Sequence, residues 1–175
     1  LNNYYEVVVE IVFRHEGTVD KFMGDGMMVL WGAPINHEDD PARSVRAALD
    51  IQRAMESFNF DRAARGQLPI EVGIGINTGP VVAGYLGSSR TMSYSVIGDT
   101  VNLASRLCAA ALPGEIVLSE YTQFLVHDEF LTKLRNPIHA KGKSQPLKAF
   151  SVIGTKTMIP HPAPKAEVLL KAEGA

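Results

Sequence analysis

The chain has 175 residues, of which 46% are hydrophobic and 21% are charged, and its formal net charge at pH 7 is −2. This length and balance predict one soluble globular domain and exclude a disordered or disulfide-built chain. The near-neutral charge argues against broad nucleic-acid binding, which needs a basic face to displace counterions from phosphates.

The beginning of the chain and its cysteine content indicate its setting. The single cysteine, Cys108, cannot form a disulfide within the chain and is interpreted as a small buried thiol, so we expect a reducing, cytoplasmic location. No apolar run approaches the roughly 20 residues that span a bilayer, so we expect no membrane contact from this segment. Because Leu1 already belongs to a helical pattern, we interpret the chain as part of a longer protein.

Hydrophobic periodicity and turn residues divide the chain into alternating helices and strands. In chain order we predict a helix to about Arg14, a hairpin over 18–31 that turns at 24–26, a helix over 42–58, strands over 70–77, 79–84 and 92–97, a helix over 99–111, a strand over 115–119, a helix over 121–126, and strands near 138–140 and 147–153.

Two of these elements carry a more detailed expectation. In the strand over 70–77, apolar residues alternate with Gly73 and Gly75, so another element is expected to approach the bare face closely. The helix over 99–111 is expected to take Asp99 as its N-cap. Its predicted buried side comprises Val101, Ala104 and Cys108.

The order of elements predicts an α+β, ferredoxin-like fold of the β-α-β-β-α-β type, with small additional strands near the C-terminus. The first, central strand of that unit would precede the first helix, and the sequence contains no such segment. We place the domain at residues 1–154 and interpret 155–175, which contain three alternating prolines, as a linker or tail.

Two charged residues of the predicted hairpin are candidates for ligand binding. Period-two alternation puts Lys21 on one face with Val19 and Met23, where a lysine is either a snorkelling side chain or a donor to a ligand. Asp25 lies in a Gly-Asp-Gly turn, and taken alone it is better explained by turn geometry, with Mg²⁺ binding as the alternative.

The segment 98–106 is the most informative stretch. Asn102 and Arg106 are four residues apart on one helical stripe, where they are either an ordinary polar pair or a clamp for ribose and phosphate oxygens. Lys141 belongs to what is, on its own, only a basic turn. A phosphate-binding loop ending in Gly-Lys-Ser/Thr is absent, the five histidines lack metal-ligand spacing, and the aromatic signature of an RNA-binding sheet is missing.

Taken together, the segments 20–32, 72–84 and 94–106 resemble the three signature blocks of class III nucleotide cyclases, in the same order. The resemblance covers about residues 1–153 and implies the cyclase version of the ferredoxin-like fold. It also implies a head-to-tail homodimer in which each active site takes residues from both copies, and an upstream sensor domain in the parent protein.

The resemblance implies a role for each candidate. Asp25 of one copy would bind two Mg²⁺ (or Mn²⁺) ions per complete site, while Lys21 and Ser95 of the other copy would bind the adenine edge of ATP. Asn102 would orient the ribose, and Arg106 and Lys141 would neutralise phosphate charge while cyclic AMP and pyrophosphate form.

Two departures from the family pattern qualify this expectation. Ser95 stands where adenylyl cyclases more often carry aspartate or threonine, which weakens the expected discrimination against GTP, whereas Lys21 disfavours a guanylyl cyclase. The first metal-binding aspartate of the family lies on the strand that the sequence lacks, so we expect little activity from the 175 residues alone. An inactive cyclase-like module, a guanylyl cyclase and an RNA-binding ferredoxin-like domain are the competing interpretations.

Overall fold

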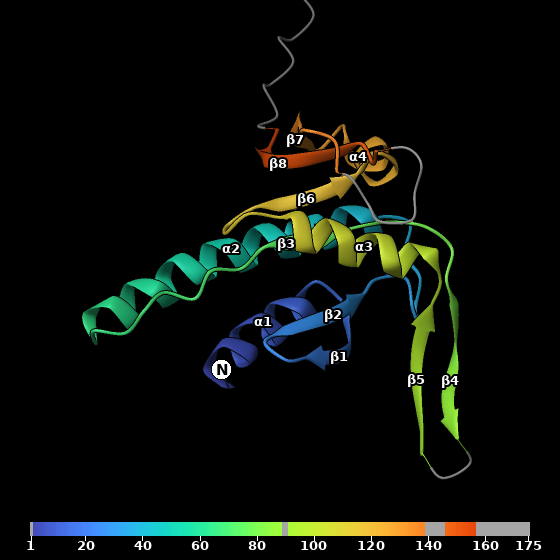
Figure 1. The fold of residues 1–175 in the computed structure, drawn as a ribbon, viewed down its shortest axis with the longest axis horizontal. Helices are drawn as coiled ribbons and strands as arrows, with labels where there is room; N and C mark the ends of the chain where they lie inside the picture. Colours follow the sequence, from blue (N-terminus) through green and yellow to red (C-terminus); the bar gives the residue numbers. More distant parts are fainter. Residues whose placement is uncertain (1, 89–90, 139–145, 157–175) are drawn as a thin grey trace, which may run out of the picture.

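The computed structural model describes residues 2–88, 91–138 and 146–156, and within these ranges the chain forms four helices and eight strands (Figure 1). The helices are α1 (Asn2–Arg14), α2 (Asp40–Ala64), α3 (Asp99–Ala110) and α4 (Glu120–Val126). The strands are β1 (Thr18–Met23), β2 (Gly26–Leu30), β3 (Ile74–Ile76), β4 (Val82–Ser88), β5 (Thr91–Ile97), β6 (Ile116–Ser119), β7 (Phe130–Leu134) and β8 (Ala149–Thr155). The α+β fold is as predicted, and the tail beyond 156 lies outside the described residues.

The first helix and the hairpin form where the sequence predicts them. The apolar stripe of α1, with Tyr4, Val8, Ile11 and Val12, is buried against α2 and the β1–β2 hairpin. The hairpin turns at Gly24, whose φ of 65° is the left-handed conformation that glycine tolerates. Among the described residues, no helix is both long enough and apolar enough to cross a bilayer.

The second helix is longer than predicted. The polar segment 61–64, expected to lie beyond the helix, forms its last turn, because Arg and Ala are good helix formers and need no apolar neighbour.

The strand over 70–77 is shorter than predicted. Its first residues bond to α2 instead of to a strand: Asn59 bonds both backbone groups of Ile70, and Gln52 donates to the carbonyl of Val72 at 2.8 Å.

The element that approaches the bare glycine face is α3. A Cβ added at Gly75 would lie 2.1 Å from the backbone nitrogen of Cys108 and 2.7 Å from the carbonyl oxygen of Ala104. This contact corrects the predicted buried side of α3: Leu107 is fully buried beside Leu103, whereas Cys108 is exposed. On the face of α3 that periodicity assigned to buried side chains, the helix backbone itself packs against Gly75.

The predicted N-cap of α3 is also wrong. Helix α3 begins at Asp99, and the residue before it, Gly98, occupies the cap position with φ of 146°. Asp99 therefore lies in the first turn, where a carboxylate interacts favourably with the helix dipole.

We expect Gly75→Ala to destabilise the domain by about 3 kcal/mol or more, the upper end of overpacking costs, because the new methyl group meets backbone rather than a movable side chain. Urea unfolding of the purified variant measures the loss. The matched control is Gly154→Ala in β8, where nothing lies within 4 Å, and its effect is expected to stay within about 0.5 kcal/mol. Equal unfolding midpoints for the two variants would contradict the close packing of α3 on β3.

The remaining strands form one four-stranded sheet and one separate hairpin. The sheet has the order β3-β6-β8-β7, with β3 parallel to β6 and the other pairs antiparallel, and the hairpin is β4–β5. Strand β7 was not predicted, because only Phe130 is buried on this edge strand and its apolar alternation is weak. The strand predicted near 138–140 is reduced to a single bridge between Ile138 and Leu147, and 139–140 lie outside the described residues.

In the part of the chain that the structure describes, the hairpin β1–β2 and the four-stranded sheet are not paired with each other, and the ferredoxin-like unit would have its first, central strand between them. Among the described residues, β2 pairs only with β1 and β3 only with β6. Both strands nevertheless rest on the same buried cluster of α1 and α2, through Met27 and Val29 of β2 and Ile74 of β3. The divided sheet therefore matches the incomplete β-α-β-β-α-β unit that the sequence predicts.

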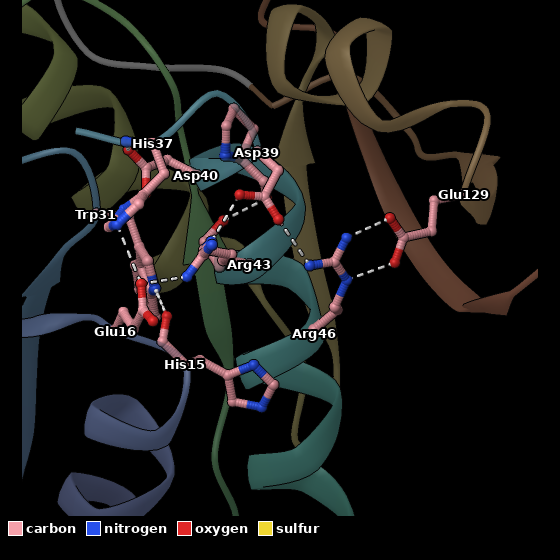
Figure 2. Close-up of polar contacts among 11 residues, drawn as sticks. His15, Glu16, Trp31, His37, Asp39, Asp40, Arg43, Arg46 and Glu129 are labelled. Carbon is pink, nitrogen blue, oxygen red and sulfur yellow. Dashed lines mark hydrogen bonds and ion pairs between the residues drawn. The ribbon is translucent and has the colours of Figure 1, made fainter.

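A polar network anchors the hairpin to α2 (Figure 2). Trp31, just after β2, donates to the carbonyl of His15 at 3.0 Å. Arg43 bonds both Glu16, after α1, and Asp39, before α2. Arg46 extends the network to Glu129 beside β7, through bonds of 2.6 and 2.7 Å. The charges thus fix the corner between α1 and β1 relative to the four-stranded sheet (Figure 2).

The network should make stability depend on pH. Hydrogen bonds from Arg43 and Arg46 lower the pKa of the Asp39 carboxyl in the folded state. A carboxyl whose pKa is lowered by folding contributes stability above its unfolded pKa, about 3.9, and loses it as the pH falls through the folded pKa. We therefore expect Asp39→Asn to lose less stability between pH 5 and pH 3 than the wild type, measured by urea unfolding. The control is Asp61→Asn, an exposed position near the other end of α2, which should follow the wild type. Parallel pH profiles for all three proteins would contradict this role of Asp39.

Candidate active site

Strand β1 contains a bulge that determines where its charged residues point. Val19 pairs with Val29 and Lys21 with Met28, so Asp20 is an extra residue in β1. Val19 and Val29 pack against the helices. Lys21 therefore lies on the opposite, open face of the hairpin, and the prediction that it shares a face with Val19 is wrong. The open face is the one on which a lysine can meet a ligand.

Lys21 and Ser95 come together on one carboxylate. Ser95 of β5 is 3% exposed and donates its hydroxyl hydrogen bond to Oδ2 of Asp20 at 3.0 Å. The Nζ atom of Lys21 lies 3.2 Å from the same oxygen. The Asp20 side chain is 1% exposed, while that of Lys21 is 46% exposed. The two residues predicted to bind the base are thus neighbours, although 74 positions separate them in the chain.

Asp20 is the residue of this cluster that sequence reasoning missed. A regular strand would turn Asp20 and Lys21 to opposite faces, and only the bulge brings the carboxylate beside the ammonium group. A charged pair in the middle of a predicted apolar strand is the one signal that could have indicated it.

Asp25 lies at the tip of the β1–β2 hairpin and is exposed. The tip is held to α1 by Tyr5, whose hydroxyl donates to the carbonyl of Gly24 at 2.5 Å. Burial raises the pKa of the Tyr4 phenol, and Tyr5, Asp25 and Cys108 raise it further through their charges. Tyr4, near the start of α1, is thus within electrostatic reach of the hairpin tip and of the last turn of α3.

Asn102 and Arg106 lie one turn apart on α3, Asn102 exposed and Arg106 half-buried. Two side chains fix the start of this helix: Asn77 donates to the carbonyl of Thr100 at 2.9 Å, and Thr100 donates to the carbonyl of Pro80 at 2.6 Å. Lys141 lies outside the described residues.

Within one copy of the chain, contacts with Asp20 bring two of the candidate residues together. Lys21 and Ser95 are joined through Asp20. Within 2–88, 91–138 and 146–156, no hydrogen bond or ion pair joins Asp25 to that cluster. The same described ranges contain no group of three or more His, Cys, Asp or Glu side chains placed to hold a metal ion. An isolated exposed carboxylate still fits Mg²⁺, which binds through one or two carboxylates together with substrate phosphates.

An open groove of about 1090 Å³ lies elsewhere, between the start of α3 and α4. Its lining includes Asp99, Tyr121 and Phe124, and none of the six candidate residues contributes to it. Within one copy, this groove and the candidate residues are therefore separate.

The geometry can be compared with known proteins. The family model described as "Adenylate and Guanylate cyclase catalytic domain" matches residues 1–154. "Adenylate cyclase 1" of Rhizobium meliloti is 30% identical over 163 residues, which cover 88% of this chain and 24% of that protein. The chain thus spans about a quarter of the length of this curated relative.

Solved structures of two cyclases share the fold. The adenylyl cyclase CyaB from P. aeruginosa is 34% identical with a TM-score of 0.85, over 89% of this chain and 81% of that one. The guanylyl cyclase Cya2 is 35% identical with a TM-score of 0.85, over 91% of this chain and 81% of that one. Because both activities occur among such neighbours, overall similarity identifies the catalytic domain and leaves its base preference open. The chain belongs to the adenylate and guanylate cyclase catalytic domain family.

Proposed function

We propose that this domain is an adenylyl cyclase, which forms cyclic AMP and pyrophosphate from ATP. The observation that carries the choice of ATP is the pair of Lys21 and Ser95, held side by side on the carboxylate of Asp20. Lysine donates hydrogen bonds and never accepts them, so Lys21 suits N1 of adenine and opposes the N1–H of guanine. The Ser95 hydroxyl oxygen can accept from the exocyclic amine of adenine.

The residues on α3 would act on the ribose and the phosphates. Asn102 is exposed and would hold the ribose in the orientation for attack. Arg106, one turn further along α3, would neutralise the charge that grows on the phosphates as pyrophosphate leaves, and Lys141 would assist it. A guanidinium group suits this task because it stays charged and presents several donors in one plane.

In the reaction, a new bond forms between the ribose 3′-oxygen and the α-phosphorus, and the bond from that phosphorus to the pyrophosphate oxygen breaks. The proton of the 3′-hydroxyl leaves to solvent, and the electron pair of the broken bond leaves with pyrophosphate. Asp25 would hold the divalent ions, Mg²⁺ or Mn²⁺ and two per complete site. Bound ions supply charge neutralisation at the phosphates and favour the ionised 3′-oxygen. The protein residues orient and neutralise, so the site needs no nucleophilic side chain.

We propose further that two copies pair head to tail, with Asp25 from one copy and Lys21, Ser95, Asn102 and Arg106 from the other in each site. The β4–β5 hairpin, which projects from the body as an arm (Figure 1), supports this arrangement. Its exposed side chains include Val82, Tyr85 and Met92, at 66%, 73% and 61% exposure. An apolar arm of this kind favours burial against a second copy.

Turnover of ATP and GTP by the natural full-length protein tests the proposal. With Mg²⁺ and then Mn²⁺ present, we expect cyclic AMP as the main product and cyclic GMP as a minor one. Cyclic GMP as the main product would establish a guanylyl cyclase instead, and binding of both nucleotides without either product would establish an inactive module.

A further inference from the structure

The buried carboxylate of Asp20 has no part in the roles assigned above, yet it contacts both residues that would bind the base. The same oxygen, Oδ2, accepts from the Ser95 hydroxyl at 3.0 Å and lies 3.2 Å from Nζ of Lys21. A side chain that is 1% exposed, fixed by a β-bulge and bonded to two neighbours from two strands cannot reorient freely.

This contact restricts what Ser95 can offer a ligand. A serine hydroxyl has one hydrogen and can act either as donor or as acceptor toward a ligand. A carboxylate beside a lysine only accepts, so the hydroxyl hydrogen of Ser95 is directed to Asp20. What remains for the ligand is the oxygen lone pairs, which makes Ser95 an acceptor only. Lys21 keeps its remaining hydrogens and is a donor only.

The fixed polarity distinguishes the two purines when the ribose holds the base in one orientation. Adenine presents an amine donor at position 6 and an acceptor at N1, which complement an acceptor at Ser95 and a donor at Lys21. Guanine presents a carbonyl acceptor at position 6 and a donor at N1. In the same orientation, guanine would place its carbonyl acceptor against the acceptor Ser95 and its N1–H donor against the donor Lys21.

We infer that Asp20 is a positioning residue that sets purine selectivity, by holding the Ser95 hydroxyl as an acceptor and Lys21 beside it as a donor. The inference rests on the proposed function of Lys21 and Ser95 as the base-binding pair. It also removes the weakness expected of a serine at position 95, because a serine whose hydrogen is already committed discriminates like a group that only accepts.

The test compares Asp20→Ala with the wild-type full-length protein, through the ratio of kcat/KM for ATP to kcat/KM for GTP. Freed from Asp20, Ser95 can donate to the guanine carbonyl, so we expect the ratio to fall about tenfold or more. The ratio does not depend on the fraction of folded enzyme, because unfolding lowers both rates equally. If turnover is too low to measure, the ratio of affinities for ATP and GTP by titration calorimetry replaces it.

The matched control is the same change in a Ser95→Ala background. With no hydroxyl to hold, Asp20→Ala should change the ratio much less there than in the wild type. An unchanged ratio in the single variant, or an equal fall in both backgrounds, would overturn the inference. A wild-type protein that does not prefer ATP would instead refute the proposed function, so the two failures are distinguishable.

Discussion

Replacing Arg106 by alanine is expected to lower cyclic AMP formation by about 10²–10³ in kcat, by analogy with removal of a donor that acts mainly in the transition state. The affinity for ATP should change much less, since the charge of Arg106 is needed mostly as pyrophosphate leaves. Arg106 is half-buried on α3, whose position is fixed by the contact of its backbone with Gly75. Steady-state kinetics together with equilibrium binding of an ATP analogue separate the two effects.

A matched control keeps this experiment interpretable. Ser105→Ala removes a neighbouring exposed side chain of α3 and should leave kcat near the wild-type value. Unfolding midpoints of both variants show whether the helix is intact. Normal turnover in Arg106→Ala together with reduced stability would mean that Arg106 only supports the packing of α3, and its catalytic role would be withdrawn.

The second large effect is expected at the base. Lys21→Glu combined with Ser95→Cys should move the preference from ATP toward GTP, because a carboxylate accepts from guanine N1–H and a thiol donates to its carbonyl. Loss of a matched hydrogen bond costs about 1–3 kcal/mol, so each contact should change the preference roughly ten- to hundredfold. Lys21→Glu also places a second carboxylate beside Asp20, so the swap is made together with Asp20→Asn, which removes the repulsion.

The control for this swap is Asp20→Asn alone, and the measurement is kcat/KM for each nucleotide. The full swap should prefer GTP or show no preference. The control keeps Lys21, a donor to adenine N1, and should therefore favour GTP less than the full swap does. If the full swap prefers ATP as strongly as the wild type, Lys21 and Ser95 do not contact the base.

Much of the fold follows from local sequence signals. The Gly-Asp-Gly turn fixed the hairpin, and the apolar stripe fixed α1, because these features act within a few residues of one another. Other features depend on contacts between distant residues. Asn59 bonds the backbone of Ile70 and so shortens β3, and the close approach of Gly75 to α3 decides which side of that helix carries side-chain packing.

The cluster of Asp20, Lys21 and Ser95 shows the same limit more sharply. The sequence identified Lys21 and Ser95 through their resemblance to the family, and the structure places them together. It did not identify Asp20, because period-two alternation puts Asp20 and Lys21 on opposite faces, and only the bulge in β1 brings the two side chains together. The roles of all six candidates stay predictions: Lys21, Asp25, Ser95, Asn102, Arg106 and Lys141.

The central claim is that two copies of the chain build each adenylyl cyclase site, and mixing two damaged proteins tests it most directly. Asp25→Asn and Arg106→Ala, carried on differently tagged full-length chains, should each give little cyclic AMP when expressed alone. When they are co-expressed in equal amounts, half of the dimers are mixed and one of the two sites in each is intact, so activity should recover to about one quarter of the wild-type value. Purification through both tags confirms that mixed dimers form. Mixed dimers with no more activity than the sum of the two variants would contradict a site shared between copies.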